Sequence, residues 1–242
     1  MNLVIDVGNT RVKFGLFNAG KLSFKNSGSK SDFLGMMASI LESRPRPEHC
    51  IISKVSDLSE EQMGFLSQNF EVLVLDHLTP IPFKNKYESP ETLGIDRIAL
   101  VSAASQKYEN KNVLIVDAGT CITYDFLNSE NEYLGGAISP GVSLRYKALH
   151  TYTHKLPLLA AAQPSSYLGK NTAAAIHTGV VNGVLYEIDG HINEYKNVYD
   201  NLTVILTGGD AHFLRDSLKN DIFANSNFLL EGLNHILEYN KL

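Results

Sequence analysis

Two short segments of the chain share a pattern that could bind the phosphates of a nucleotide. The first, Leu3-Val4-Ile5, runs into Asp6-Val7-Gly8-Asn9-Thr10, and the second, Leu114-Ile115-Val116, runs into Asp117-Ala118-Gly119-Thr120. An apolar run ending in Asp-x-Gly is typical of a buried strand that delivers a carboxylate to a tight turn. Glycine lets the backbone approach a ligand closely, and Asn or Thr adds hydrogen-bond groups. Two such turns facing each other across a cleft predict a duplicated phosphotransferase architecture.

The first turn contains the groups that magnesium and phosphate require. The Asp6 carboxylate could hold Mg²⁺ directly or through water. The backbone N–H groups of residues 8–10 could surround a phosphate, helped by the Lys13 side chain. A single Asp-x-Gly-Asn more often closes an Asx-turn in a hairpin, but the second copy favours the functional interpretation.

The second turn offers similar chemistry with fewer charged groups. Asp117 could bind a second cation, while Gly119 and Thr120 contact phosphate. A third glycine turn, Thr207-Gly208-Gly209, follows the apolar run Val204-Ile205-Leu206 and suits packing of a nucleotide base or ribose against bare backbone. Alone this third turn is weak evidence, because strand–Gly–Gly–helix turns are common structural devices.

Phosphoryl transfer to an alcohol also needs a base beside the acceptor hydroxyl. Asp96 is the best candidate, because it follows Gly94 at the end of a long proline-punctuated loop, residues 76–94, where a helix begins. Arg97 beside it offers a fork for a carboxylate or phosphate. A structural interpretation stays open, in which Asp96 caps the helix and Arg97 forms a surface ion pair.

Other catalytic patterns are missing from the sequence. Gly169-Lys170-Asn171-Thr172 lacks the upstream glycine of a Walker P-loop, and no protein-kinase, His-Glu-x-x-His or Gly-x-Ser-x-Gly motif occurs. His150 and His154 lie four residues apart without a third ligand, which favours surface positions over a metal site.

The elements that must position these residues alternate between strands and helices, which indicates an α/β fold with a mixed sheet. In the first half the pattern predicts a hairpin-like pair over 2–17, helices over 33–41 and from Ser59, with a Ser59–Gln62 capping box, and strands over 50–53 and 72–75. A helix over 98–105 follows. In the second half it predicts the repeated strand–turn–strand from 112, a long helix over 173–195, a strand over 204–206 and a helix over 229–237. We therefore expect two tightly packed lobes, 1–111 and 112–242.

Bulk properties restrict the function class. The chain has 242 residues, of which 44% are hydrophobic, and a net charge of −5 without a long basic run, so nucleic-acid binding is not expected. Its two cysteines, Cys50 and Cys121, cannot build a disulfide framework. No apolar run approaches the roughly 18 residues that span a bilayer. These features predict a protein of the reducing cytoplasm that does not associate with membranes.

The whole set of motifs resembles one known family, the type III pantothenate kinases of the actin/Hsp70/sugar-kinase fold superfamily. The Asp-x-Gly-Asn-Thr turn alone indicates only the superfamily, whereas the Tyr–Pro–Gly-x-Asp-Arg block is much more specific. The matching segments, in family order, are Asp6 to Thr10, Tyr87-x-x-Pro90-x-x-Leu93-Gly94-Ile95-Asp96-Arg97, Asp117 to Thr120, Gly135 to Gly141, Ala148-Leu149 to Leu156-Pro157, Gly169 to Thr172 with Ile176 and Gly179, and Thr207-Gly208-Gly209.

This resemblance implies a fold, a reaction and a set of roles. The fold is two ribonuclease-H-like lobes related by duplication, and the reaction is ATP-dependent phosphorylation of pantothenate to 4′-phosphopantothenate, the entry step of coenzyme A synthesis. Asp96 is implied as the general base, Asp6 as acting through Mg²⁺, and Asp117 as ligand of a monovalent cation, K⁺ or NH₄⁺. The family is dimeric, with pantothenate near the subunit interface, which implies a homodimer.

The implied binding residues fall into two groups. Those for ATP are Asp6, Val7, Gly8, Asn9, Thr10, Arg11, Val12, Lys13 and Thr120. Those for pantothenate are Tyr87, Gly94, Ile95, Asp96, Arg97 and Thr172.

Two positions depart from the family pattern, and two alternatives stay open. Ile95 stands where a small residue is usual, which could reshape the substrate pocket, and Cys121 stands where Ala is common.

One alternative function is that of another kinase or phosphatase of the superfamily, such as a small sugar kinase. The other is a binding or regulatory protein, since relatives were once described as accessory transcription factors.

Overall fold

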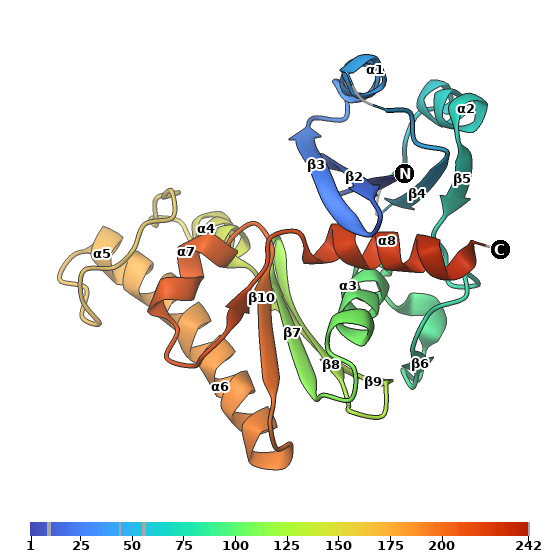
Figure 1. Ribbon diagram of the computed structural model, residues 1–242. Coiled ribbons are helices and arrows are strands. Elements are labelled where there is room, and N and C mark those ends of the chain that lie inside the picture. Colours follow the sequence, from blue (N-terminus) through green and yellow to red (C-terminus); the bar gives the residue numbers. More distant parts are fainter. Residues whose placement is uncertain (9–10, 44, 55–56, 242) are drawn as a thin grey trace. The chain divides into compact units, whose positions relative to one another are not determined.

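The computed structural model describes residues 1–8, 11–43, 45–54 and 57–241. These residues form two compact units, one of Met1–Glu109 with Asn227–Leu242 and the other of Asn110–Ser226. Each unit layers helices on its own sheet (Figure 1). Asn9 and Thr10, which belong to the first predicted turn, lie outside the described residues.

The sheet of the first unit has the strand order β3-β2-β1-β4-β5. β1 pairs antiparallel with β2, and β2 with β3, whereas β1–β4 and β4–β5 are parallel. The central strand is buried along its whole length, as its apolar run predicts. The strands are β1 (Asn2–Val7), β2 (Val12–Asn18), β3 (Lys21–Gly28), β4 (His49–Lys54) and β5 (Glu71–Val74), with the short β6 (Lys84–Asn85) in the following loop.

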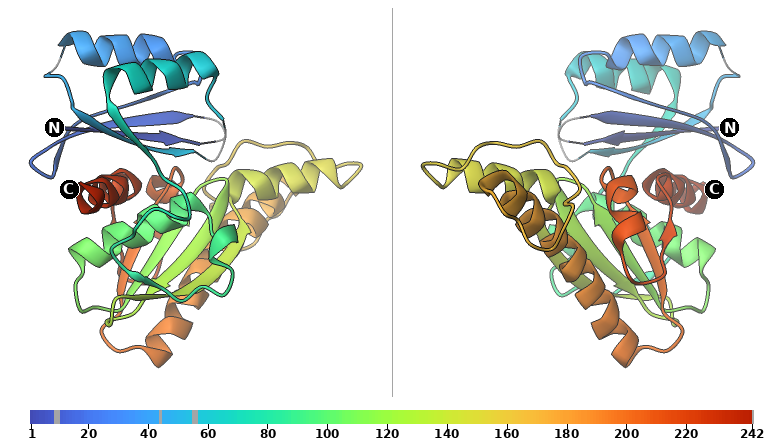
Figure 2. Two further views of the ribbon diagram at one scale, coloured as in Figure 1. Left: turned by 90° about the vertical axis from the view of Figure 1, so that its right-hand side faces the viewer. Right: turned by 90° about the vertical axis from the view of Figure 1, so that its left-hand side faces the viewer.

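Helices cover both faces of this sheet. α1 and α2 lie on one face and α8 on the other (Figure 2). The predicted capping box at the start of α2 is confirmed, since Ser59 Oγ accepts from the Gln62 N–H and the Gln62 side chain accepts from the Ser59 N–H. The helices are α1 (Phe33–Ser43), α2 (Glu60–Asn69), the 3₁₀ turn η1 (Pro90–Thr92), α3 (Ile95–Lys107) and α8 (Phe228–Asn240).

The second unit repeats the topology of the first. Its strands follow the order β11-β10-β7-β8-β9, with β7–β8 and β8–β9 antiparallel and β7–β10 and β10–β11 parallel. β7 therefore corresponds to β1 and β10 to β4, and the two units are ribonuclease-H-like lobes related by duplication, as the sequence predicts. The strands are β7 (Val113–Ala118), β8 (Cys121–Leu127), β9 (Glu132–Pro140), β10 (Thr203–Thr207) and β11 (Phe223–Ala224).

The long helix of the second unit contains an interruption that its sequence pattern does not predict. Helical backbone begins at Thr172, but the turns of Thr178–Asn182 are a π-helix between two α-helical parts. The helices are α4 (Val142–Thr151), α5 (Thr172–His177), the π segment η2 (Thr178–Asn182), α6 (Gly183–Val198), α7 (Ala211–Leu214) and the 3₁₀ turn η3 (Arg215–Ser217).

The last helix, α8, packs in the first unit although it follows the second along the chain. It buries its apolar side chains against β1, β4 and α3, and Gly232 allows close contact, because a Cβ there would lie 1.8 Å from the Ala99 carbonyl oxygen. Polar bonds join it to the first strand, with Asn2 Nδ2 donating to Asn234 Oδ1 over 2.8 Å. The predicted lobe limits of 1–111 and 112–242 assigned this helix to the second lobe.

Within the described ranges, no helix combines the length and the apolar character needed to cross a bilayer.

Candidate active site

Asp6 is the last residue but one of the central strand of the first unit, where two neighbouring strands supply its partners. The parallel register sets Asp6 beside Ser53 on β4, whose Oγ donates to Asp6 Oδ1 over 3.0 Å. The antiparallel register sets it beside Lys13 on β2, whose Nζ lies 3.4 Å from Asp6 Oδ2. Ser53 was not among the predicted site residues. It could be found only by pairing the predicted strands in parallel.

The Asp6 carboxyl is 5% exposed, and its pKa lies above the ordinary 3.8. Burial is the main cause, since it disfavours the charged form, and the negative charge of Asp96 adds to the rise. Lys13 and the Ser53 hydrogen bond act in the opposite direction but do not cancel it. A cation near Asp6 would supply the missing positive charge, so the residues present fit Mg²⁺.

The described part of the first turn is built mainly from backbone. The Gly8 N–H donates to the Arg11 carbonyl over 3.0 Å. Val7 and Val12 are fully buried core residues, so only their backbone could reach a ligand. The Arg11 guanidinium donates to Ser27 O and Oγ, each over 3.1 Å, and so is held by β3.

Asp96 lies in the first turn of α3 and does not cap it. The N-cap is Gly94, which has no side chain, and the helix begins at Ile95, so the capping interpretation of Asp96 is wrong. Asp96 Oδ1 accepts from the Arg97 backbone N–H over 2.9 Å. Gly94 makes room for this carboxylate, because a Cβ there would lie 2.4 Å from Asp96 Oδ1. This bond gives the carboxylate a defined orientation at the start of the helix.

The loop before α3 packs onto Arg97. This side chain is 4% exposed, and its guanidinium carbon lies 5.6 Å from the centre of the Tyr87 ring, within reach of a cation–π interaction. The interpretation of Arg97 as one half of a surface ion pair is therefore wrong. His77, which the sequence did not single out, contacts the Leu93 carbonyl through Nε2 at 2.9 Å and ties the start of the loop to its end.

In the second unit, three glycine-containing segments close around the end of β7. Gly208 follows β10 with a φ of +96°, and a Cβ there would lie 2.3 Å from the Ala118 carbonyl oxygen and 2.4 Å from Asp117 Oδ1. The Asp210 N–H donates to the same Ala118 oxygen over 2.9 Å. Glycine is required at position 208 because a side chain would meet both the strand end and its carboxylate.

The turn after β7 is supported from its other side by the segment that ends β9. The Gly141 N–H donates to the Thr120 carbonyl over 3.0 Å. A Cβ on Gly141 would lie 2.1 Å from the Gly119 oxygen and 2.6 Å from the Thr120 oxygen. The Asp117 carboxylate therefore lies beside the backbone of Gly208, while the carbonyl oxygens of Gly119 and Thr120 lie against Gly141.

Thr172 opens α5, where Asn171 caps the helix by accepting from the Ala174 N–H over 2.9 Å. With Ile176 and Gly179 it lines an open groove of about 850 Å³ whose walls are mostly apolar. His150 contacts the Leu156 carbonyl at 2.8 Å and is exposed. No group of three or more His, Cys, Asp or Glu side chains able to hold a metal was found among the residues that are described.

Comparison with known proteins identifies the family. The family model of the type III pantothenate kinases matches residues 2–194. The chain belongs to the type III pantothenate kinase family. A protein of that name from Flavobacterium johnsoniae is 47% identical over 239 residues, covering 99% of this chain and 98% of its own. Another from Christiangramia forsetii is 47% identical over 241 residues, covering 100% and 99%. The predicted family and enzyme class are confirmed.

Solved structures agree on the fold. A Campylobacter jejuni protein described as a Baf family transcriptional activator aligns with a TM-score of 0.64 at 23% identity, covering 98% of both chains. Glucokinase from an Antarctic psychrotroph aligns with a TM-score of 0.53 at 12% identity, covering 99% of both. At these identities the likeness concerns the fold alone, which is the one expected of a type III pantothenate kinase.

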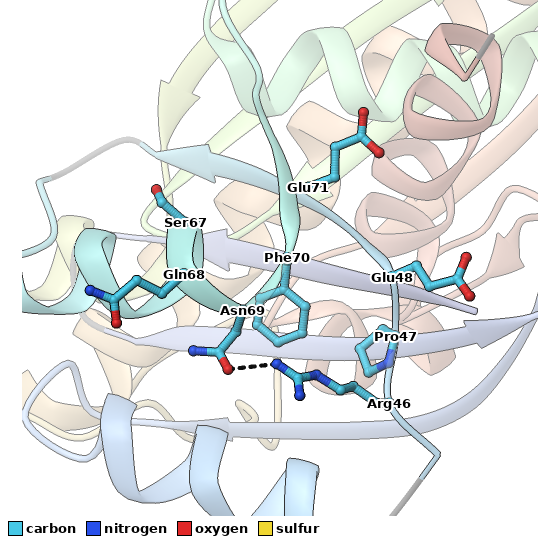
Figure 3. A pocket seen from close by; sticks show the side chains of 8 residues that line it. All are labelled: Arg46, Pro47, Glu48, Ser67, Gln68, Asn69, Phe70 and Glu71. Atoms are coloured by element: carbon cyan, nitrogen blue, oxygen red, sulfur yellow. Dashed lines mark hydrogen bonds between the residues drawn. The ribbon is translucent and has the colours of Figure 1, made fainter.

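One further pocket of the first unit, of about 530 Å³, contains none of the residues that the family resemblance implies. It is lined by residues 46–48 and 67–71, and Arg46 donates to Asn69 Oδ1 over 2.8 Å (Figure 3). Its side chains are mixed in charge and form an open depression, so it adds nothing to the site of a pantothenate kinase.

Replacing Gly208 by alanine tests the close contact between the Gly208 backbone and the end of β7. We expect Gly208→Ala to lower the free energy of unfolding by about 2 kcal/mol or more, because it combines a left-handed backbone with a steric clash. Gly209→Ala is the matched control, since a Cβ there meets nothing within 4 Å. Urea unfolding followed by circular dichroism measures the free energy of unfolding of both variants. Equal decreases in the two variants would contradict the close contact between Gly208 and the end of β7.

Replacing Asp6 by asparagine tests the cost of the buried carboxylate. Its folded-state pKa is above the ordinary 3.8, so the folded wild type loses stability as the pH rises from 3.8 through that raised value. Asparagine has no proton to lose. We expect the melting temperature of Asp6→Asn relative to wild type to increase from about pH 4 to about pH 8, as measured by scanning fluorimetry. A difference in melting temperature that does not change with pH would show that burial does not raise the pKa of the Asp6 carboxyl.

Proposed function

We propose that this protein transfers the γ-phosphoryl group of ATP to the hydroxyl of pantothenate and forms 4′-phosphopantothenate, the first step of coenzyme A biosynthesis. The observation that carries the proposal is the full-length match, at 47% identity, to proteins named type III pantothenate kinase. The proposed reaction consumes ATP, so we propose the cytoplasm as its location.

The first turn is the proposed site for Mg²⁺ and the ATP phosphates. Asp6 would hold the metal, whose charge neutralises phosphate oxygens when it is bound. Lys13 lies beside Asp6 on the neighbouring strand and would contact the phosphates, together with the backbone of the turn. The raised pKa of the Asp6 carboxyl supports this role, because a buried carboxylate with too little positive charge around it favours a cation.

Asp96 is the proposed general base. Its carboxylate would accept the proton of the pantothenate hydroxyl as the oxygen attacks phosphorus. The bond from the Arg97 N–H to Oδ1 supports this role, since it fixes one oxygen and leaves the other to face the substrate. The influence of Asp96 on the Asp6 pKa supports a common site for the base and the metal-binding carboxylate.

Pantothenate recognition is assigned to the loop before α3 and to the start of α5. The Arg97 guanidinium would pair with the pantothenate carboxylate, and Tyr87 stacks on that guanidinium and orients it. Gly94 and Ile95 would contact the substrate through the backbone at the N-terminus of α3. Thr172 would add a hydroxyl from the groove of the second unit.

Asp117 is the proposed ligand of a monovalent cation, K⁺ or NH₄⁺, and Thr120 the proposed ATP contact beside it. The Asp117 carboxylate at the end of β7 supports this role, because it supplies a negatively charged oxygen ligand for a cation.

We also propose a homodimer. The groove lined by Thr172 is largely apolar, and Tyr152 at its edge is 86% exposed. Nearby Leu168 is 59% exposed and Tyr167 81% exposed, so this face of the second unit carries apolar surface that a second copy could cover.

A coupled assay tests the proposed function directly. With ATP, Mg²⁺, K⁺ and pantothenate, we expect the purified protein to release ADP, and we expect a lower rate when Na⁺ replaces K⁺. Omission of pantothenate is the control for background hydrolysis. An ADP signal that does not depend on pantothenate under any of these salts would overturn the assignment.

Removal of the proposed base gives a second test. Asp96→Asn keeps the shape of the side chain but cannot accept the proton, so we expect kcat to fall by about 10²-fold or more. ATP binding, measured by calorimetry, should change little. Glu91→Gln is the matched control, because Glu91 is an exposed carboxylate on the same loop. Near-normal turnover of Asp96→Asn would exclude Asp96 as the base.

A further inference from the structure

A cluster of polar side chains lies in the second unit, and the resemblance assigns no role to it. At its centre is Glu187 on α6. Its Oε1 accepts from the Tyr124 hydroxyl over 2.9 Å and from the Ser139 hydroxyl, and its Oε2 accepts from Arg145 over 2.5 Å. One carboxylate therefore joins α6 to three consecutive elements that precede it by some distance in the sequence, namely β8, β9 and α4.

The cluster connects to the turn after β7 through two further bonds. Arg145 Nε donates to the Pro140 carbonyl over 2.8 Å, which fixes the end of β9. The next residue, Gly141, donates its N–H to the Thr120 carbonyl over 3.0 Å and lies directly against Gly119. A continuous chain of contacts thus leads from Glu187 to the turn of Gly119 and Thr120.

The cluster is not required to attach α6 to the sheet. Four apolar side chains of α6 already bury its inner face, and Glu187 and Arg145 keep 26% and 21% of their side-chain surface exposed. The pKa of the Glu187 carboxyl lies below its usual range, because hydrogen bonds from Ser139, Arg145 and Tyr124 outweigh its partial burial. The carboxylate is therefore charged at neutral pH. The four side chains are Val184, Leu185, Ile188 and Ile192.

We propose that Glu187 and Arg145 are positioning residues, which hold the segment Ser139–Gly141 against the turn of Gly119 and Thr120 and so fix the geometry with which that turn contacts ATP. The inference rests on the proposed function, since it takes Thr120 as the ATP contact. It adds two side chains that do not themselves touch the nucleotide.

Truncation of Glu187 tests this role. In Glu187→Ala, Arg145 and the two hydroxyls lose their common partner, and we expect the dissociation constant for Mg-ATP to rise by about tenfold in calorimetry. KM for ATP should rise similarly, with little change in kcat. Glu194→Ala is the matched control, because Glu194 is an exposed carboxylate on the same helix, and its ATP affinity should equal that of the wild type.

Two further variants separate positioning from general destabilisation. Glu187→Gln should lie between wild type and Glu187→Ala, because its amide oxygen can still accept from Arg145 while the hydroxyls of Tyr124 and Ser139 turn to accept from its amide nitrogen. The double variant Arg145→Gln with Glu187→Ala should lose less ATP affinity than the losses of the two single variants added together, since both changes break the same connection.

The possible outcomes decide the proposal. An affinity loss in Glu187→Ala equal to that of Glu194→Ala would overturn it, and so would a fall in melting temperature with kcat and both KM values changed together. A wild type that binds ATP but releases no ADP with pantothenate would refute the proposed function, while the ATP affinities would still decide the role of Glu187. A wild type that binds no ATP would overturn both.

Discussion

The turn that follows β7 in the second unit depends on how closely bare backbone approaches the end of that strand. Gly208 and Gly141 contact the strand end and its turn from two sides, at distances that leave no space for a Cβ. These residues are far apart in sequence, and each is placed by a different strand, so the turn keeps its shape only while β9 and β10 keep theirs. The positions of Asp117 and Thr120 are therefore a property of the whole sheet.

The two lobes share a topology but hold their aspartates by different physical means. Asp6 is buried and touches a lysine and a serine side chain from its neighbouring strands. Asp117 meets backbone instead, at Gly208. The duplicated strand order therefore places an aspartate at the same position of both lobes, beside Ser53 in the first and beside Thr207 in the second, and the immediate neighbours of the two carboxylates differ.

Local patterns were sufficient to predict much of this fold. The Ser59–Gln62 capping box and the central strands follow from residues close in sequence, whereas α3 begins at Ile95, three residues before the predicted helix over 98–105. The π segment η2 carries no such signal, and β3 is an edge strand with little apolar alternation. Ser53, Glu187 and the packing of α8 depend on pairings between distant segments. Such pairings require the strand order, which propensity and periodicity do not supply.

The position of α8 also affects how the chain acquires its structure during synthesis. The first lobe is complete only when α8 covers β1 and α3, and α8 leaves the ribosome after every residue of the second lobe. Domains usually fold from the N-terminus as they emerge, but here the first lobe keeps an apolar surface exposed until α8 has been synthesised. Its completion is thereby delayed until the second lobe has been made, and the nascent chain must avoid aggregation over that interval.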